Sequence, residues 1–167
     1  KNLINDLPIL KPSYANNNFS SYDHLNSIKE NDFSKLYSGK NLIDIIKNSS
    51  FQEISSHTFS HYYCLEKGQN VNQFKADLIK QLEISNKNNT SIASIIFPRN
   101  QYNDEYLKIC SDLGFTSYRG IVKTIVHKPI SKKNLTLFKR AIRFIDNYIN
   151  IYGYRTHSFL VKYNDSI

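Results

Sequence analysis

The stretch SIASIIFP, residues 91–98, is the part of the sequence that decides the fold. Its apolar residues form an almost continuous run, which is typical of a strand covered on both faces, as in a parallel sheet. Pro98 ends the run because proline has no N–H to give to a sheet. Working outward, an amphipathic helix is predicted before it over about Val71–Ser85. Another is predicted after it, from Asn103 or Asp104 to Leu113.

Shorter elements flank this centre. Strands are predicted at Phe51–Ser55 and Phe115–Tyr118, and helices near Tyr22–Lys29, at Asn41–Asn48 and at Asn134–Tyr152. Alternating strands and helices indicate an α/β fold with mostly parallel strands. A chain of 167 residues suits a single domain over residues 1–167. The last helix is expected to turn one apolar stripe inward: Leu135, Phe138, Ile142, Ile145, Ile149 and Tyr152.

The composition is that of a globular protein, with 40% hydrophobic and 13% aromatic residues. Two cysteines, Cys64 and Cys110, are too few for a disulfide framework and are expected to be buried thiols. No apolar run reaches the roughly 18 residues of a membrane span. No signal peptide is visible, which favours the cytoplasm. However, the chain starts at Lys1 rather than Met, so we expect the natural N-terminus to be missing and leave localisation open.

The net charge of +8 admits a polyanion-binding protein as one interpretation. The lysines are scattered, and no zinc-finger spacing, RNP motif or basic heptad region is present, so nucleic acid is not expected as a partner. The closest basic cluster is expected to be a solvated helix face: Lys128, Lys132, Lys133, Lys139, Arg140 and Arg143.

His57 and His61 are the candidate metal ligands. They follow the predicted strand Phe51–Ser55 at a spacing of i, i+4, which on a helical turn places both rings on one face. This separation allows one nitrogen of each ring to bind the same ion. The alternative is two ordinary surface or core histidines that have this spacing by chance. Tyr62 and Tyr63 are suited to stack on a sugar or to close the core, and at least one is expected in the core.

Three blocks resemble the polysaccharide deacetylases of the NodB-homology family. The first holds the family's motif of a histidine, then Ser or Thr, two variable residues and a second histidine. It resembles one bacterial branch closely as far as Gln69, and the resemblance as a whole extends over about Leu42 to Gly120. The blocks are Glu53–Gln69, Ile96–Gln101 and Gly114–Gly120.

The resemblance implies a distorted (β/α) barrel and a divalent metal, usually zinc. By position His57 and His61 are ligands, Thr58 braces the loop between them, and Arg99 positions a catalytic carboxylate. The implied reaction is hydrolysis of the acetamide of an amino sugar in a polysaccharide or glycan. The metal would polarise the amide, an Asp would act as base, and a His would protonate the leaving amine.

Two pieces of the family pattern are missing. The chain has no Asp-Asp pair, which would supply the base and the third ligand, and no convincing late histidine motif. His157 lies in the right half without the expected neighbours. We therefore expect the central fragment of a catalytic domain or, alternatively, a degenerate homologue, with both catalytic residues outside the chain. Substitute ligands would be Asp23, Asp32 or Asp44.

Two further functions stay open beside the hydrolase. One is a catalytically inactive carbohydrate-binding or assembly protein on the same scaffold. The other is a polyanion-binding module, which would show steep salt dependence. The sequence leaves the sugar, the linkage, the acyl group, the metal and the oligomeric state open.

Overall fold

The computed structural model describes residues 7–22, 39–121, 127–128 and 130–149. Contacts divide the chain into two compact units. Unit 1 comprises Lys1–Gly120 with Pro129–Asn134, and unit 2 comprises Ile121–Lys128 with Leu135–Ile167. The single domain expected from the sequence stays a prediction.

The centre of unit 1 is a small parallel sheet. Strand β1 (Ser94–Ile95) pairs in parallel with β2 (Ser117–Tyr118), with Ser94 opposite Ser117. On the other side of β1, Ser56 forms a parallel bridge with Ile95, where the Ser56 N–H donates to the Ser94 carbonyl at 2.9 Å. The parallel pairing agrees with the sequence prediction, whereas the (β/α) barrel stays a prediction.

The paired segments are shorter than the sequence predicted. Of the strand predicted at Ser91–Phe97, only β1 pairs as a strand. The strand predicted at Phe51–Ser55 is wrong, because regular pairing begins only at Ser56. The Phe51 side chain is fully exposed and its φ is +61°, a left-handed conformation that does not continue a strand.

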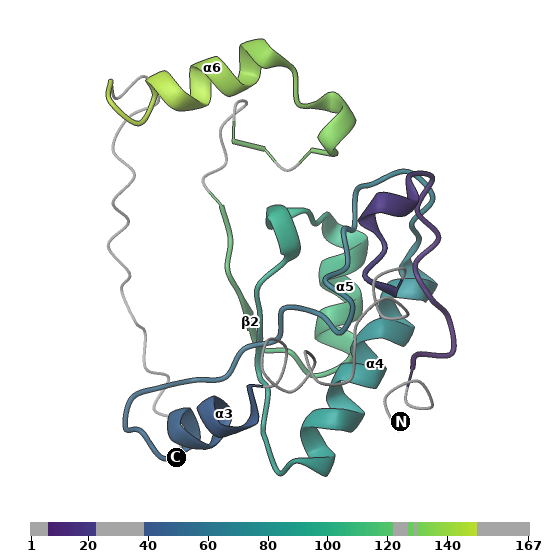
Figure 1. The fold of residues 1–167 in the computed structure, drawn as a ribbon, viewed down its shortest axis with the longest axis vertical. Helices are drawn as coiled ribbons and strands as arrows, with labels where there is room; N and C mark the ends of the chain where they lie inside the picture. Colours follow the sequence, from purple (N-terminus) through teal and green to yellow (C-terminus); the bar gives the residue numbers. More distant parts are fainter. Residues whose placement is uncertain (1–6, 23–38, 122–126, 129, 150–167) are drawn as a thin grey trace, which may run out of the picture. The chain divides into compact units, whose positions relative to one another are not determined.

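Helices α4 (Val71–Lys87) and α5 (Asp104–Asp112) confirm the two predicted helices and pack side by side (Figure 1). Each begins at an asparagine whose side chain accepts a backbone N–H of the first turn: Asn70 at α4 and Asn103 at α5. Their apolar faces and the sheet form the core: Tyr62, Cys64, Phe74, Leu78, Ile95, Phe97, Tyr106, Cys110 and Phe115. Both cysteines are free and buried, as expected.

Helix α3 (Lys40–Lys47) confirms the helix predicted at Asn41–Asn48, but its apolar residues Leu42 and Ile45 are more than half exposed. Short 3₁₀ turns lie at Asn17–Phe19 (η1), Pro98–Asn100 (η2) and Lys132–Asn134 (η3). The helix predicted near Tyr22–Lys29 lies, apart from Tyr22, outside the described residues.

Helix α6 (Leu137–Ile145) belongs to unit 2 and is shorter than the predicted Asn134–Tyr152. It starts late because the Thr136 side chain accepts the Lys139 N–H as an N-cap. The expected inward stripe is wrong for Phe138, Ile145 and Ile149, which are 73%, 43% and 64% exposed. Tyr152 lies outside the described residues. Within the described ranges, no helix combines the length and the apolar content that a membrane crossing needs.

Candidate metal centre

The loop from Ser56 to Tyr63, here called the histidine loop, carries both candidate ligands. It leaves the sheet at the carboxyl end of the Ser56 bridge, which is the edge where parallel sheets build their sites. The loop is not a helical turn, because Thr58 and His61 have φ values of +63° and +57°. The two histidines are therefore brought together by a strained loop, and not by the helix face expected from the sequence.

Thr58 holds the histidine loop from within. Its buried hydroxyl accepts the Tyr62 N–H at 2.7 Å, and its own N–H donates to Ser56 Oγ at 3.0 Å. A β-branched residue in the left-handed region costs about 1–3 kcal/mol, so these bonds are what keeps the conformation. Thr58 thus ties residues of the loop on both sides of His61, while its expected role between two metal ligands stays a prediction.

Asp77 of α4 holds the same loop from outside. Its carboxylate accepts the Phe59 N–H at 2.7 Å, the Ser60 N–H at 3.0 Å and the Ser60 hydroxyl. The side chain is fully buried, and this burial raises the pKa of Asp77 to about 6, against the lowering effect of its hydrogen bonds. The sequence analysis missed Asp77, although an acid between Phe74 and Leu78 on an apolar helix face was a usable signal.

The two histidine rings lie side by side. Their centroids are 4.8 Å apart and their planes are tilted by 57°. Two imidazoles that bind one ion through nitrogens at about 2.1 Å have ring centroids roughly 5 Å apart. The observed separation therefore fits a shared ion, and both residues are exposed enough to reach one.

The hydrogen bond of His57 and the pKa of His61 both suit metal binding. Nδ1 of His57 lies 2.8 Å from the Ile96 carbonyl oxygen, which can only accept, so Nδ1 donates this bond and Nε2 is the nitrogen left for an ion. Metal-binding histidines usually have such a backbone partner on the second nitrogen. Burial, His57 and Arg99 together lower the pKa of His61, which favours the neutral ring that a metal needs.

A third ligand is not found in the part of the chain that the structure describes, where no three His, Cys, Asp or Glu residues gather as a metal site would need. Asp44 lies on α3 and joins no such group. Asp23, Asp32 and His157 lie outside the described residues. The histidine pair is therefore the described portion of the candidate centre.

Arg99 lies beside the histidine loop. Its Cζ is 4.1 Å from the centroid of the Tyr63 ring, and that ring meets the His61 ring edge-on at 5.0 Å. The Tyr63 N–H is held by the Tyr14 hydroxyl at 2.9 Å. One aromatic ring thus separates the guanidinium from the candidate ligand His61. Tyr62, in contrast, is fully buried and confirms the expected core tyrosine.

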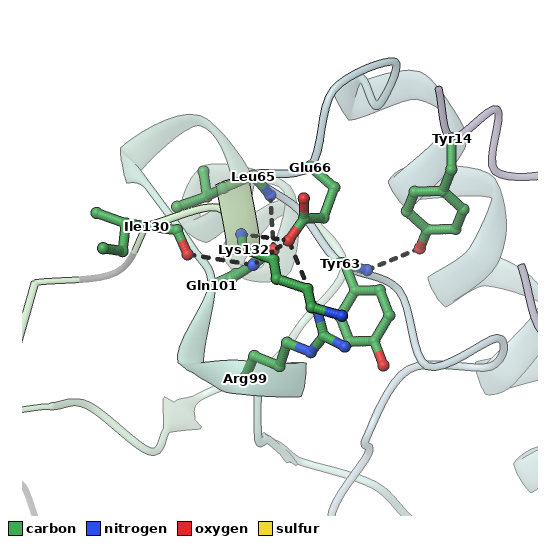
Figure 2. A network of polar contacts seen from close by, with 8 residues as sticks. All are labelled: Tyr14, Tyr63, Leu65, Glu66, Arg99, Gln101, Ile130 and Lys132. Atoms are coloured by element: carbon green, nitrogen blue, oxygen red, sulfur yellow. Dashed lines mark hydrogen bonds and ion pairs between the residues drawn. The ribbon is translucent and has the colours of Figure 1, made fainter. Parts of the chain in front are cut away.

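The carboxylate beside Arg99 is that of Glu66, which is buried (Figure 2). Glu66 Oε1 lies 3.6 Å from Arg99 Nη1 and accepts the Gln101 side-chain amide at 2.9 Å and the Lys132 backbone N–H at 2.8 Å. The Gln101 amide nitrogen also donates to the Ile130 carbonyl at 3.2 Å. Glu66 therefore joins η2 to η3 beside the histidine loop, a link that the sequence did not predict.

The arrangement is a pair of adjacent histidines in a loop that is fixed by Thr58, Asp77 and the Ile96 carbonyl. The Arg99 guanidinium lies against Tyr63, the residue that ends this loop. No family model, no curated protein and no solved structure matches this chain.

Proposed function

We propose that the chain carries part of the active site of a metal-dependent hydrolase that cleaves the acetamide of an amino sugar in a polysaccharide or glycan. The observation that carries this proposal is the geometry of His57 and His61. One histidine has its Nδ1 on a backbone carbonyl, and the second ring lies 4.8 Å away. Both histidines are exposed, and the loop between them has left-handed backbone at Thr58 and His61. Such strain clusters at functional sites, which supports a binding role for the pair.

Each residue of the candidate metal centre has a separate role in this proposal. His57 and His61 would hold a divalent ion, with zinc favoured by imidazole ligands. A bound ion supplies Lewis acidity for the amide carbonyl and acidifies water. Thr58 and Asp77 keep the loop in the conformation that brings the two rings together. The general base and general acid are assigned to no residue of this chain.

The resemblance of the three sequence blocks to polysaccharide deacetylases supports the choice of an amide bond and an amino sugar. In the structure, two of these blocks meet at the candidate centre. His57 contacts the Ile96 carbonyl, and Arg99 lies against Tyr63. Blocks separated by about 30 residues in sequence thus contribute to one place, as parts of a single site would.

The test measures zinc content and acetate release on the full-length gene product, with chitotetraose as substrate. We expect one tightly bound zinc per chain and release of acetate. His57→Gln and His61→Gln should each lower zinc affinity by at least about 10-fold and abolish acetate release. The matched control is His127→Gln, because Nε2 of His127 already contacts the Asp146 carboxylate at 2.8 Å. It should keep both properties.

Two results would overturn the proposal. Unchanged zinc affinity in both His57→Gln and His61→Gln would remove the metal centre. Zinc and chitotetraose binding without acetate release would favour the catalytically inactive carbohydrate-binding or assembly protein instead.

A further inference from the structure

Two cationic side chains of unit 1 converge on one aromatic ring beside the histidine loop. The Arg99 Cζ lies 5.0 Å from the centroid of the Phe19 ring, and the Lys132 Nζ lies 5.4 Å from the same centroid. Both residues also contact the Glu66 carboxylate, Arg99 through its guanidinium and Lys132 through its backbone N–H (Figure 2). Like charges repel, so their approach to one ring indicates a place where positive charge is concentrated.

Glu66 does not balance both of these charges. Its carboxylate pairs with Arg99 Nη1 at 3.6 Å, but it contacts Lys132 only by accepting the backbone N–H. The Lys132 ammonium lies against the Phe19 ring and forms no ion pair with any described residue. Among the described residues, one of the two cations is therefore without a counter-charge.

The Arg99 guanidinium is held in place before any ligand arrives. It lies over Tyr63 at 4.1 Å, contacts Phe19 and pairs with Glu66. Its side chain is nevertheless 37% exposed, so it remains open to solvent. A guanidinium has five N–H donors in a planar fork that matches a carboxylate or a phosphate, and a fixed fork loses little entropy on binding.

The cations are placed next to the proposed reaction centre. The Tyr63 ring contacts both the Arg99 guanidinium, at 4.1 Å, and the His61 ring, at 5.0 Å between centroids. A group bound by Arg99 would therefore lie close to a group bound at the histidine pair. Phe19 and Tyr63 are half-buried, so they shield this place from water and strengthen the charge interaction.

We propose that Arg99 and Lys132 form a subsite for an anionic group, a carboxylate or a phosphate, on the glycan whose amino sugar binds at His57 and His61. The inference deepens the proposed function and rests on it for the identity of the glycan. It makes Lys132 a specificity-determining residue. From the sequence alone, Lys132 belongs to a basic cluster that is expected to be a solvated helix face.

The test compares charged and neutral probes of similar shape. Hyaluronan tetrasaccharide, which carries carboxylates, is compared with chitotetraose, and N-acetylglucosamine 6-phosphate with N-acetylglucosamine. Dissociation constants are measured by calorimetry on the full-length product. We expect at least one charged probe to bind about fivefold more tightly than its neutral partner. The pair that shows this preference identifies carboxylate or phosphate as the group.

Two variants test the residues. Lys132→Gln should lower the affinity for the charged probe to about that for its neutral partner. The backbone N–H that donates to Glu66 remains in this variant. The neighbouring Lys133→Gln should keep the preference, because Lys133 has no described contact with the cluster. Raising salt from about 50 to about 300 mM should also reduce the preference, since screening weakens exposed charge pairs.

The proposal fails if neither charged probe is preferred, or if Lys133→Gln removes the preference as fully as Lys132→Gln does. Failure of the hydrolase proposal looks different, because acetate release would then be absent from every probe while the charge preference persists.

Discussion

Helices α4 and α6 both have apolar residues at helical spacing, but α4 buries apolar side chains that α6 leaves exposed. Both carry apolar residues at helical spacing and begin at a side-chain N-cap. Yet Phe74 and Leu78 of α4 are fully buried, whereas within its own unit α6 leaves Leu137 and Phe138 82% and 73% exposed. Amphipathic spacing thus predicts that a helix forms, but not what covers its apolar face.

The difference extends to the candidate metal centre. The buried face of α4 includes Asp77, whose carboxylate binds the histidine loop, so the helix both fills the core and supports the site. Changes on α4 should therefore affect stability and the histidine loop together. Equivalent changes on α6 should affect neither to the same degree.

The largest effect is expected for Phe74→Ala. The Phe74 ring is fully buried and lies 5.0 Å from the Tyr106 ring and 5.5 Å from the Tyr62 ring. Removing it leaves a cavity and should lower the free energy of unfolding by about 3–5 kcal/mol. Urea denaturation followed by circular dichroism measures this. A loss below about 1 kcal/mol would show that α4 is not packed as described.

A pH-dependent effect is expected from Asp77. Burial raises its folded-state pKa to about 6, well above the usual range of an aspartate, so the folded state binds the proton more tightly. The stabilising contribution of this group is therefore present below about pH 4 and lost as pH rises to about 6, by about 3 kcal/mol at most.

The measurement is the difference in unfolding free energy between the wild type and Asp77→Asn from pH 4 to pH 7. This difference should change with pH, because Asn does not titrate. Asp112→Asn is the control for removing an exposed carboxylate, because Asp112 is half-exposed and pairs with Lys108 at 3.1 Å. A constant difference for Asp77→Asn would contradict the buried carboxylate.

A smaller effect separates two glycines with positive φ. Gly68 has a φ of +98°, and an added Cβ would lie 2.1 Å from the Ser13 carbonyl oxygen, whereas Gly114 has a φ of +88° and open space around it. Gly68→Ala should cost at least about 2 kcal/mol, since backbone must move, and Gly114→Ala only about 1 kcal/mol. Equal costs would show that Ser13 does not pack against Gly68. Thermal unfolding of both variants decides this.

The smallest effect is expected for Phe138→Ala on α6. An exposed side chain contributes little to stability, so the free energy of unfolding should change by less than about 0.5 kcal/mol. The same urea denaturation as for Phe74→Ala provides the comparison. A loss above about 1 kcal/mol would show that the apolar face of α6 is covered in solution.

Local signals in the sequence predicted the elements of unit 1 well. Apolar spacing predicted α4, a cap at Asn103 or Asp104 placed the start of α5, and the apolar run ending at Pro98 identified the central strand. These features depend on neighbours within a few residues, so sequence spacing is sufficient for them. The prediction of a strand at Phe51–Ser55 was wrong because the local sequence does not show whether another strand will pair with these residues.

The candidate site was predictable only in part, for a related reason. His57 and His61 could be found because four residues separate them. The other residues of the site depend on hydrogen bonds between distant parts of the chain. The bonded residues are 18 positions apart for Asp77, 35 for Glu66 and 66 for Lys132. Such contacts depend on the fold rather than on spacing, so a sequence read without the fold places Lys132 in a solvated basic face.

The most direct test of the central claim is anomalous diffraction at the zinc edge from crystals grown with zinc. We predict one strong peak about 2.1 Å from both Nε2 of His57 and a ring nitrogen of His61, with Nδ1 of His57 still on the Ile96 carbonyl. A peak that involves neither histidine, or rings whose free nitrogens point away from each other, would contradict the account.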